Sequence, residues 1–158
     1  MPESFINIIT DKIQQAYELY YRLILVVAPA GNGKTAVLQE VHQQIGAPLI
    51  NINLELSSRL LEIPERQRAL QVLKILTDIV NTNKKDVLLF DNIEILFDIS
   101  LKQDPLRLLQ ELSRTTTIIA SWNGTIENDH LVYATPDHLE YRRHPIKDFL
   151  VINLNKTT

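Results

Sequence analysis

The chain has 158 residues and a formal net charge of −3 at pH 7, and 45% of its residues are hydrophobic, which is sufficient for one globular domain with a substantial core. The absence of cysteine excludes disulfides, thiol nucleophiles and zinc–thiolate sites, and the charge does not indicate a nucleic-acid or acidic-membrane partner. No apolar run is long enough to span a bilayer and the N-terminus lacks a signal-peptide pattern, so we expect a cytoplasmic protein without membrane contact.

Helices and buried strands are predicted to alternate along most of the chain. In chain order we expect a helix over 3–21, a strand over 22–27, a helix over 35–45, a strand over 48–53, a short helix over 57–62, a helix over 64–80, a strand over 87–91, a helix over 104–114, a strand over 115–123 and a strand over 148–154. Continuously apolar strands are typical of a parallel sheet buried on both faces. We therefore expect an α/β three-layer sandwich with a five-stranded parallel sheet. The whole chain, 1–158, is expected to be a single domain, with an N-terminal helix (1–21) and an α/β core (22–154).

The stretch APAGNGKT (28–35) joins the first predicted strand to a helix, which is the context of a phosphate-binding loop. Backbone N–H groups at a helix N-terminus bind phosphate, a lysine here would reach the β- and γ-phosphates, and a threonine would bind Mg²⁺. Ala28 replaces the usual first glycine, a mild departure because it closes the strand. The alternative is an ordinary strand-to-helix turn with a surface lysine. The expected ATP-binding residues are Pro29, Ala30, Gly31, Asn32, Gly33, Lys34, Thr35 and Ala36.

The strand VLLFD (87–91) ends in an aspartate, which is the pattern of a Walker B segment. We expect Asp91 beside Thr35, both binding Mg²⁺, although an aspartate that merely ends a strand is the alternative. Many P-loop ATPases have a glutamate base at the next position, but here it is Asn92, which can orient water and cannot accept its proton. Glu94 is the nearest carboxylate and a candidate base, with a plain surface position as an equal alternative. The sequence therefore supports ATP binding more strongly than hydrolysis.

Polar residues near the last two predicted strands are further candidates. Asn123 ends the strand over 115–123 and is a candidate sensor for the γ-phosphate or water, with an ordinary Asn-Gly turn as the alternative. Gly124 is expected to allow a sharp turn. Arg142 and Arg143 are candidates for a finger arginine that reaches a neighbouring subunit's nucleotide, or else a solvated surface pair. Less favoured finger candidates are Arg107 and Arg114.

Several other cations surround Pro64 and the loop before the third predicted strand. They are Arg59, Arg66, Arg68, Lys84 and Lys85. A basic patch is one interpretation, and a solvated helix face is the favoured one.

Nearly the whole chain resembles the BrxF family, the small AAA+-like P-loop proteins of type 3 BREX bacteriophage-defence systems. The resemblance is carried by APAGNGKTAVLQEV (28–41), PLININLELSSRLLEIPERQRALQ (48–71), LLFDNIEILFDISLKQDPLRLLQELSR (88–114), ASWNG (120–124) and HLEYRRHP (138–145). It implies a role beside a DNA methyltransferase, a large ATPase and an alkaline-phosphatase-like protein. It also implies phosphate and magnesium roles for Lys34, Thr35 and Asp91 and a sensor role for Asn123. The Asp-Asn pair of the Walker B segment belongs to the family pattern.

These features together predict an oligomerising ATPase or nucleotide-dependent assembly switch that uses ATP and Mg²⁺ in phage defence. We expect a homo-oligomer that acts with the other BREX proteins, with any DNA contact non-specific. The sequence ends after the fifth strand without the helical lid usual in AAA+ proteins, so we expect another subunit to complete the site. A non-hydrolysing ATP-binding scaffold is the alternative that Asn92 favours. A small-molecule kinase is the least favoured, because ELSSRLLEIP (55–64) supplies only scattered charges.

Overall fold

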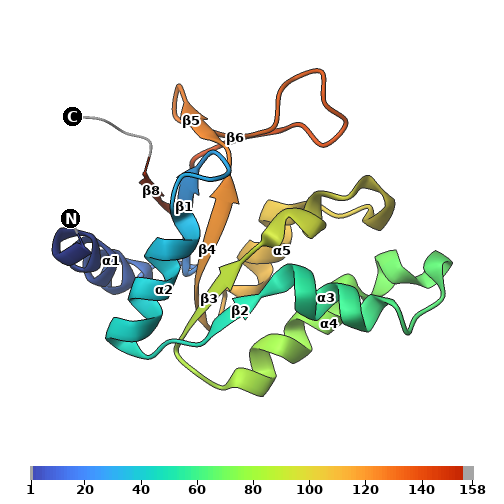
Figure 1. Cartoon of the computed structure of the whole chain (residues 1–158), viewed down its shortest axis with the longest axis horizontal. Coiled ribbons are helices and arrows are strands. Elements are labelled where there is room, and N and C mark those ends of the chain that lie inside the picture. Colours follow the sequence, from blue (N-terminus) through green and yellow to red (C-terminus); the bar gives the residue numbers. More distant parts are fainter. Residues whose placement is uncertain (1, 155–158) are drawn as a thin grey trace.

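The computed structural model describes residues 2–154, whose strands form a larger and a smaller sheet (Figure 1). The elements are α1 (Pro2–Ala16), β1 (Leu23–Ala28), α2 (Lys34–Ile45), β2 (Leu49–Asn51), α3 (Ile52–Leu60), the 3₁₀ helix η1 (Glu65–Gln67), α4 (Arg68–Asn83), β3 (Val87–Asp91), the 3₁₀ helices η2 (Ile93–Phe97) and η3 (Ile99–Leu101), α5 (Pro105–Leu112), β4 (Thr117–Asn123), β5 (Thr125–Glu127), β6 (His130–Tyr133), β7 (Arg142–Pro145) and β8 (Leu150–Asn153).

The larger sheet has five parallel strands in the order β2-β3-β4-β1-β8. Because side chains alternate along a strand, the fully buried β1 contributes to two cores. Leu23, Leu25 and Val27 pack in the core that includes α3, α4 and α5, whereas Ile24 and Val26 pack in the core that includes α1 and α2. The predicted three-layer α/β sandwich with a five-stranded parallel sheet is confirmed.

The carboxyl ends of the parallel strands lie at one edge of this sheet, the upper edge in Figure 1. The loop after β1 and the last residues of β3 and β4, Asp91 and Asn123, therefore meet there. Ligands of open α/β sheets bind at this edge, because the loops that follow the strands converge on it. The fold thus brings together segments that lie far apart in the sequence.

The smaller sheet is antiparallel, with the order β5-β6-β7, and it occupies a connection that the sequence analysis left unassigned. In Figure 1 it lies above the carboxyl edge of the larger sheet. Its strands have three or four residues, and β7 reads RRHP, so neither an apolar run nor a clear alternation identifies them. Trp122 of β4 donates its indole N–H to the Val132 carbonyl at 3.2 Å, which attaches β6 to the larger sheet.

Several predicted boundaries were wrong, including that of the helix expected over 64–80, which spans Arg68–Asn83. The first helix ends at Ala16 rather than at residue 21, and turns and bends follow it. The second strand ends at Asn51, because the side chain of that residue accepts a hydrogen bond from Leu54 N–H at 3.0 Å and so caps α3. This helix consequently begins five residues before the predicted start at residue 57. No helix within residues 2–154 is long and apolar enough to cross a membrane.

Candidate functional site

The loop between β1 and α2 adopts the backbone conformation that an anion-binding turn requires. Gly31 and Gly33 have φ angles of 81° and 88°, in the left-handed region where glycine is favoured. A Cβ at either position would meet no atom within 4 Å, so backbone conformation rather than crowding explains the two glycines. Gly33 precedes α2, and no side chain caps this helix end. The first N–H groups of α2 are therefore available to an anion.

Lys34 lies folded over this loop. Its ammonium group donates a hydrogen bond to the Pro29 carbonyl at 2.9 Å, and the residue is only 6% exposed. Burial lowers the pKa of Lys34, and the charges of Glu94 and Asp91 oppose that change. The cation is thus held inside the loop and close to two carboxylates, a position from which it can meet an incoming phosphate.

Asp91 is buried and accepts hydrogen bonds at both carboxylate oxygens. The Thr35 hydroxyl donates to Oδ2 at 2.7 Å, the Ser121 hydroxyl donates to Oδ1 at 2.8 Å and the Asn92 N–H donates to Oδ1 at 2.9 Å. The structure therefore brings together Thr35 and Asp91, the two residues that the sequence analysis proposed for magnesium.

This pair fits a magnesium ion that is also bound by a nucleotide. A hydroxyl and a carboxylate supply the hard oxygen ligands that Mg²⁺ prefers. The part of the chain that the structure describes has no group of three or more His, Cys, Asp or Glu residues arranged to hold a metal. A magnesium ion beside Thr35 and Asp91 would accordingly take its other ligands from phosphate oxygens and water, as is usual for Mg²⁺ in phosphate sites.

The chain turns sharply after Asp91. Asn92 has a left-handed conformation, with φ 55° and ψ 54°, and η2 follows it directly. This turn places Glu94 in the site, where its Oε2 accepts a hydrogen bond from the Asn123 amide at 2.7 Å. Burial raises the pKa of Glu94, and the negative charge of Asp91 raises it further. A hydrogen bond from its own backbone and the positive charge of Lys34 act in the opposite direction.

A single cavity of about 310 Å³ unites these groups. Its lining residues are Ala30, Gly31, Gly33, Lys34, Thr35, Asp91, Asn92, Glu94 and Asn123. Three predicted loop residues, Pro29, Asn32 and Ala36, are not among them. Residues predicted from three separate segments thus line one cavity, whose lining includes one basic and two acidic side chains.

The two predicted finger arginines occupy different environments. Arg142 is partly buried and donates a hydrogen bond to the Gln103 carbonyl at 2.9 Å, whereas Arg143 is exposed. This difference follows from the alternation of side chains along β7. Neither arginine lines the cavity.

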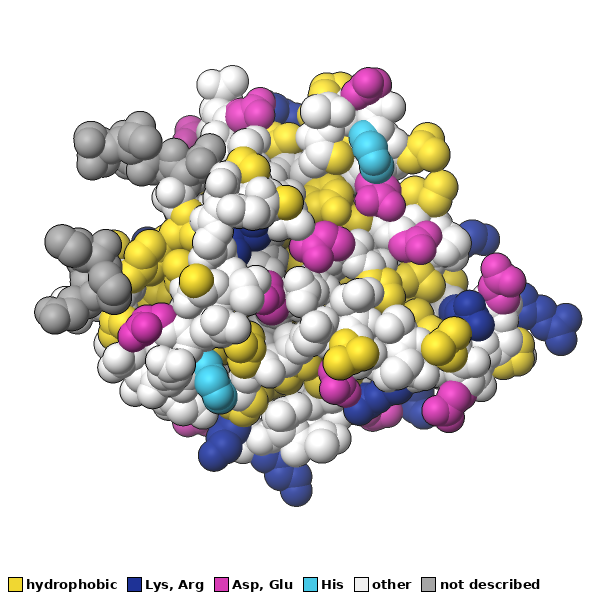
Figure 2. Space-filling view, viewed as in Figure 1, with side chains coloured by type: hydrophobic (Ala, Val, Ile, Leu, Met, Phe, Trp, Pro, Cys, Tyr) yellow, Lys and Arg dark blue, Asp and Glu magenta, His cyan; other side chains and the backbone are white. Residues whose placement is uncertain are grey.

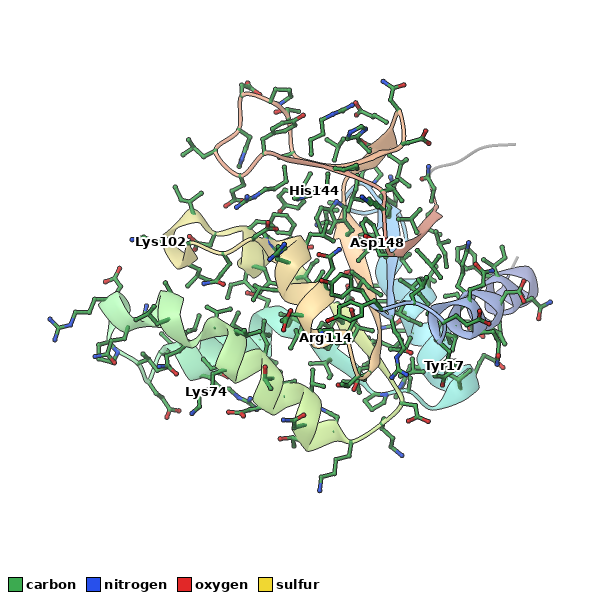
Figure 3. All side chains as sticks on the ribbon, turned by 180° about the vertical axis from the view of Figure 1, so that it is seen from behind. Tyr17, Lys74, Lys102, Arg114, His144 and Asp148 are labelled. Carbon is green, nitrogen blue, oxygen red and sulfur yellow. The ribbon has the colours of Figure 1, made fainter. Side chains whose placement is uncertain are left out.

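The other arginines lie elsewhere on the molecule. Arg114 precedes β4, so it lies at the edge of the larger sheet opposite to the cavity. It pairs there with Glu111 at 3.4 Å. Figure 3 shows it far from His144 of the smaller sheet. Arg107 is exposed on α5. Arg59 pairs with Glu55 at 3.5 Å.

Positive charges do not form a continuous area on the face shown in Figure 2, where basic and acidic side chains are interspersed. Arg68, on the helix after Pro64, donates its Nε–H to the Ile63 carbonyl at 3.0 Å. The solvated-face interpretation of the cations around Pro64 accords with these contacts.

Sequence reasoning missed two features of the site. Ser121 bonds to Asp91, and its position two residues before Asn123 on a strand would have placed both side chains on one face. The chain bends at Gly124, as expected, but this glycine does not have a positive φ. A Cβ on this residue would lie 1.9 Å from the Val132 carbonyl oxygen, so close packing explains the glycine.

Comparisons with known proteins support the fold and identify a family. A search among curated proteins finds no match. Among solved structures, that of C. elegans PCH-2 aligns with 99% of this chain and 43% of its own chain, at 13% identity and a TM-score of 0.50, so this chain spans less than half of that protein and the likeness concerns the fold. The sequence pattern described as "ATPase family associated with various cellular activities (AAA)" matches residues 24–123, from β1 to the end of β4. The chain belongs to this AAA family of ATPases.

Proposed function

We propose that this protein binds ATP with Mg²⁺ at the cavity between the β1–α2 loop, Asp91 and Asn123, and that it works as an oligomerising ATPase or nucleotide-dependent assembly switch. The observation that carries the proposal is that one cavity gathers Lys34, Thr35, Asp91 and Glu94 at the carboxyl edge of the sheet. Membership of the AAA family, whose members use nucleotide and commonly oligomerise, supports it.

The loop residues bind the phosphates in this proposal. Backbone N–H groups from Ala30 to Ala36 surround them at the positive end of α2. Lys34 exchanges the Pro29 carbonyl for the β- and γ-phosphate oxygens, which gives its buried ammonium a charged partner. Thr35 and Asp91 hold Mg²⁺, which neutralises charge on the phosphates.

Glu94 is the general base of the proposed reaction. Its carboxylate takes the proton of the attacking water, and a raised pKa makes it a stronger base than an ordinary glutamate. Asn123 already contacts Glu94 at 2.7 Å, so its amide holds the base and senses the γ-phosphate from the same position. Asn92 contributes mainly the turn that brings Glu94 inward.

Arg143 is the finger residue that we favour. A finger arginine must be free to enter a neighbouring subunit, and Arg143 is exposed, whereas the guanidinium of Arg142 is bound to Gln103 in its own chain. The site of one copy is then completed by the next copy, which makes hydrolysis depend on assembly.

The resemblance to BrxF supports a role in type 3 BREX phage defence. The partners would be the large ATPase, the DNA methyltransferase and the alkaline-phosphatase-like protein of that system, in the cytoplasm. The proposal includes only non-specific contact with DNA, because the net charge is −3 and the visible charges are mixed. Such binding would weaken steeply with salt; fluorescence anisotropy of a labelled duplex at two salt concentrations measures this.

A non-hydrolysing ATP-binding scaffold is the second candidate function. The position after Asp91 is an amide rather than a carboxylate, and the carboxylate of Glu94, the candidate base, is already bonded to Asn123. In this case ATP stabilises a complex and is not cleaved. Phosphate release by the assembled protein separates the two functions.

The decisive experiment measures binding of a fluorescent ATP analogue and release of phosphate on the same samples. Wild type should bind the analogue and release phosphate, and Lys34→Ala should lose both. Glu94→Gln should retain binding and lose turnover by at least about 100-fold, the usual range for a general base. Wild-type binding without phosphate release at any protein concentration favours the scaffold, and wild-type binding that Lys34→Ala leaves unchanged contradicts the site itself.

A further inference from the structure

Ser121, near the end of β4, contacts Asp91, although no role in the site was expected for it from the sequence. The residue is 1% exposed, and its hydroxyl donates to Asp91 Oδ1 at 2.8 Å. Asn92 N–H donates to the same oxygen at 2.9 Å, and the Thr35 hydroxyl donates to Oδ2 at 2.7 Å. The two carboxylate oxygens therefore have different donors, which hold the carboxylate in one orientation.

The pairing of β3 with β4 explains why this serine meets the aspartate. The ladder runs in register from Val87 and Thr117 to Phe90 and Ala120. One step further along both strands brings Asp91 beside Ser121, at the place where the backbone ladder stops. The side-chain hydrogen bond continues the connection between the strands to the edge of the site.

The Ser121 hydroxyl is buried, so it needs a hydrogen-bond partner within the protein. A hydroxyl is costly to bury without a hydrogen bond, and Ile119, which lies two residues earlier on the same face of β4, packs in an apolar core. The hydroxyl of Ser113, which is also fully buried, bonds instead to the Gln110 carbonyl at the end of α5. Of these two buried serines, only Ser121 directs its hydroxyl to a residue of the site.

We propose that Ser121 is a positioning residue for Mg²⁺: by bonding Oδ1 of Asp91, it fixes Oδ2 toward Thr35 and the metal. This inference rests on the proposed function. Groups that orient a metal ligand generally contribute to metal affinity although they do not touch the metal.

The test measures the affinity of the full chain for a fluorescent ATP analogue at increasing free Mg²⁺, and again in EDTA. Ser121→Ala should leave the affinity in EDTA within about twofold of wild type, because the serine does not touch the nucleotide. The Mg²⁺ concentration that gives half of the affinity increase should rise by about 10- to 100-fold. Ser121→Thr, which keeps the hydroxyl, should restore a dependence close to wild type.

Ser113→Ala is the matched control, because it removes a buried serine hydroxyl outside the site. It should lower the melting temperature and leave the Mg²⁺ dependence unchanged. Ser121→Cys, with a weaker donor of similar size, should shift the dependence by a smaller factor, and it provides the measurement if the alanine variant does not fold.

Two results overturn the inference: a folded Ser121→Ala protein with wild-type Mg²⁺ dependence, or equal shifts in the Ser121→Ala and Ser113→Ala variants. A wild-type protein that fails to bind the analogue, or binds it independently of Lys34, is a different result. That outcome overturns the proposed function, and this inference with it.

Discussion

Asn92 decides where the carboxylates of the site lie. Its left-handed conformation, φ 55°, turns the chain out of β3 at once, so the residue directly after Asp91 cannot continue along the strand. Asparagine adopts this conformation more readily than most residues. Glu94, the proposed base, lies two residues later in the first turn of η2 and reaches the site from there.

This conformation predicts that placing the usual glutamate after Asp91 damages the protein. Asn92→Glu should lower the free energy of unfolding by about 1 kcal/mol, because a side chain larger than asparagine is strained in the left-handed region. Asn92→Gly, which has no such strain, should lie within about 0.5 kcal/mol of wild type. Chemical denaturation measures both, and a stable Asn92→Glu protein with increased turnover would show that the turn is not required.

The raised pKa of Glu94 predicts opposite pH trends for activity and stability. As a base, Glu94 must be ionised, so turnover should fall as the pH falls through its raised pKa. A carboxyl whose pKa is higher in the folded state stabilises that state at low pH, and this contribution is lost as the pH rises through the folded-state value. The stability difference between wild type and Glu94→Gln should therefore shift against wild type with rising pH. Phosphate release and denaturation across the acidic range test the two trends, and parallel trends would contradict the assignment.

The sequence predicted the separate residues of the site better than their contacts. Lys34, Thr35 and Asp91 could be placed because a phosphate loop and a strand-ending aspartate depend on local spacing, and parallel strands bring their ends together. The bonds from Asn123 to Glu94 and from Ser121 to Asp91 join segments about thirty residues apart. They depend on strand order and register, which no local pattern specifies.

At the scale of elements, aromatic side chains join the smaller sheet to the segment that carries Glu94. The Tyr133 ring of β6 stacks on Phe97 of η2 with ring centroids 3.5 Å apart, and Trp122 of β4 packs edge-on against Phe97 at 5.1 Å. His144 of β7 packs edge-on against Trp122 at 6.4 Å. The four elements η2, β4, β6 and β7 therefore share one aromatic cluster close to Glu94.

Gly124 permits the close approach of β6 to the end of β4, because it lies against the Val132 carbonyl, which also accepts the Trp122 N–H. Gly124→Ala should lower the free energy of unfolding by about 1–3 kcal/mol, the usual cost of overpacking. It should also shift the fluorescence of Trp122, the single tryptophan. Gly46→Ala is the control, since its Cβ would enter open space: it strains a left-handed turn and should leave the fluorescence unchanged. Unchanged fluorescence in both variants would contradict the close-packing explanation.

The larger sheet was predictable because its strands are apolar and its crossovers are long. The smaller sheet was not, since its short strands owe their position to Trp122, Phe97 and the backbone of Val132 rather than to their own sequence. Tertiary contacts of this kind override weak local preferences.

At the scale of the whole molecule, the proposed neighbour contact predicts recovery of activity on mixing two inactive variants. Lys34→Ala has a defective site and an intact Arg143, and Arg143→Ala has the reverse. If Arg143 acts between subunits, an equal mixture should regain about a quarter of wild-type turnover, because random mixing leaves about a quarter of all sites both intact and beside an intact arginine.

Arg142→Ala is the matched control for the mixing experiment. Its guanidinium binds Gln103 of its own chain, so this variant should keep its turnover, and mixing it with Lys34→Ala should change the turnover only by dilution. Phosphate release before and after mixing is the measurement. An Arg143→Ala protein with wild-type turnover, or recovery in the control alone, would contradict the assignment.

The positions of Arg142 and Arg143 on β7 also determine what a change in the length of the connection between β6 and β7 would do. Arg142 faces Tyr133 and Arg143 faces Val132 in the present register. A slip of β7 by one residue would turn the inner arginine outward and the outer one inward, because side chains alternate. An insertion or deletion in residues 134–141 that shifts the strand would then exchange the two arginines without removing the exposed positive charge.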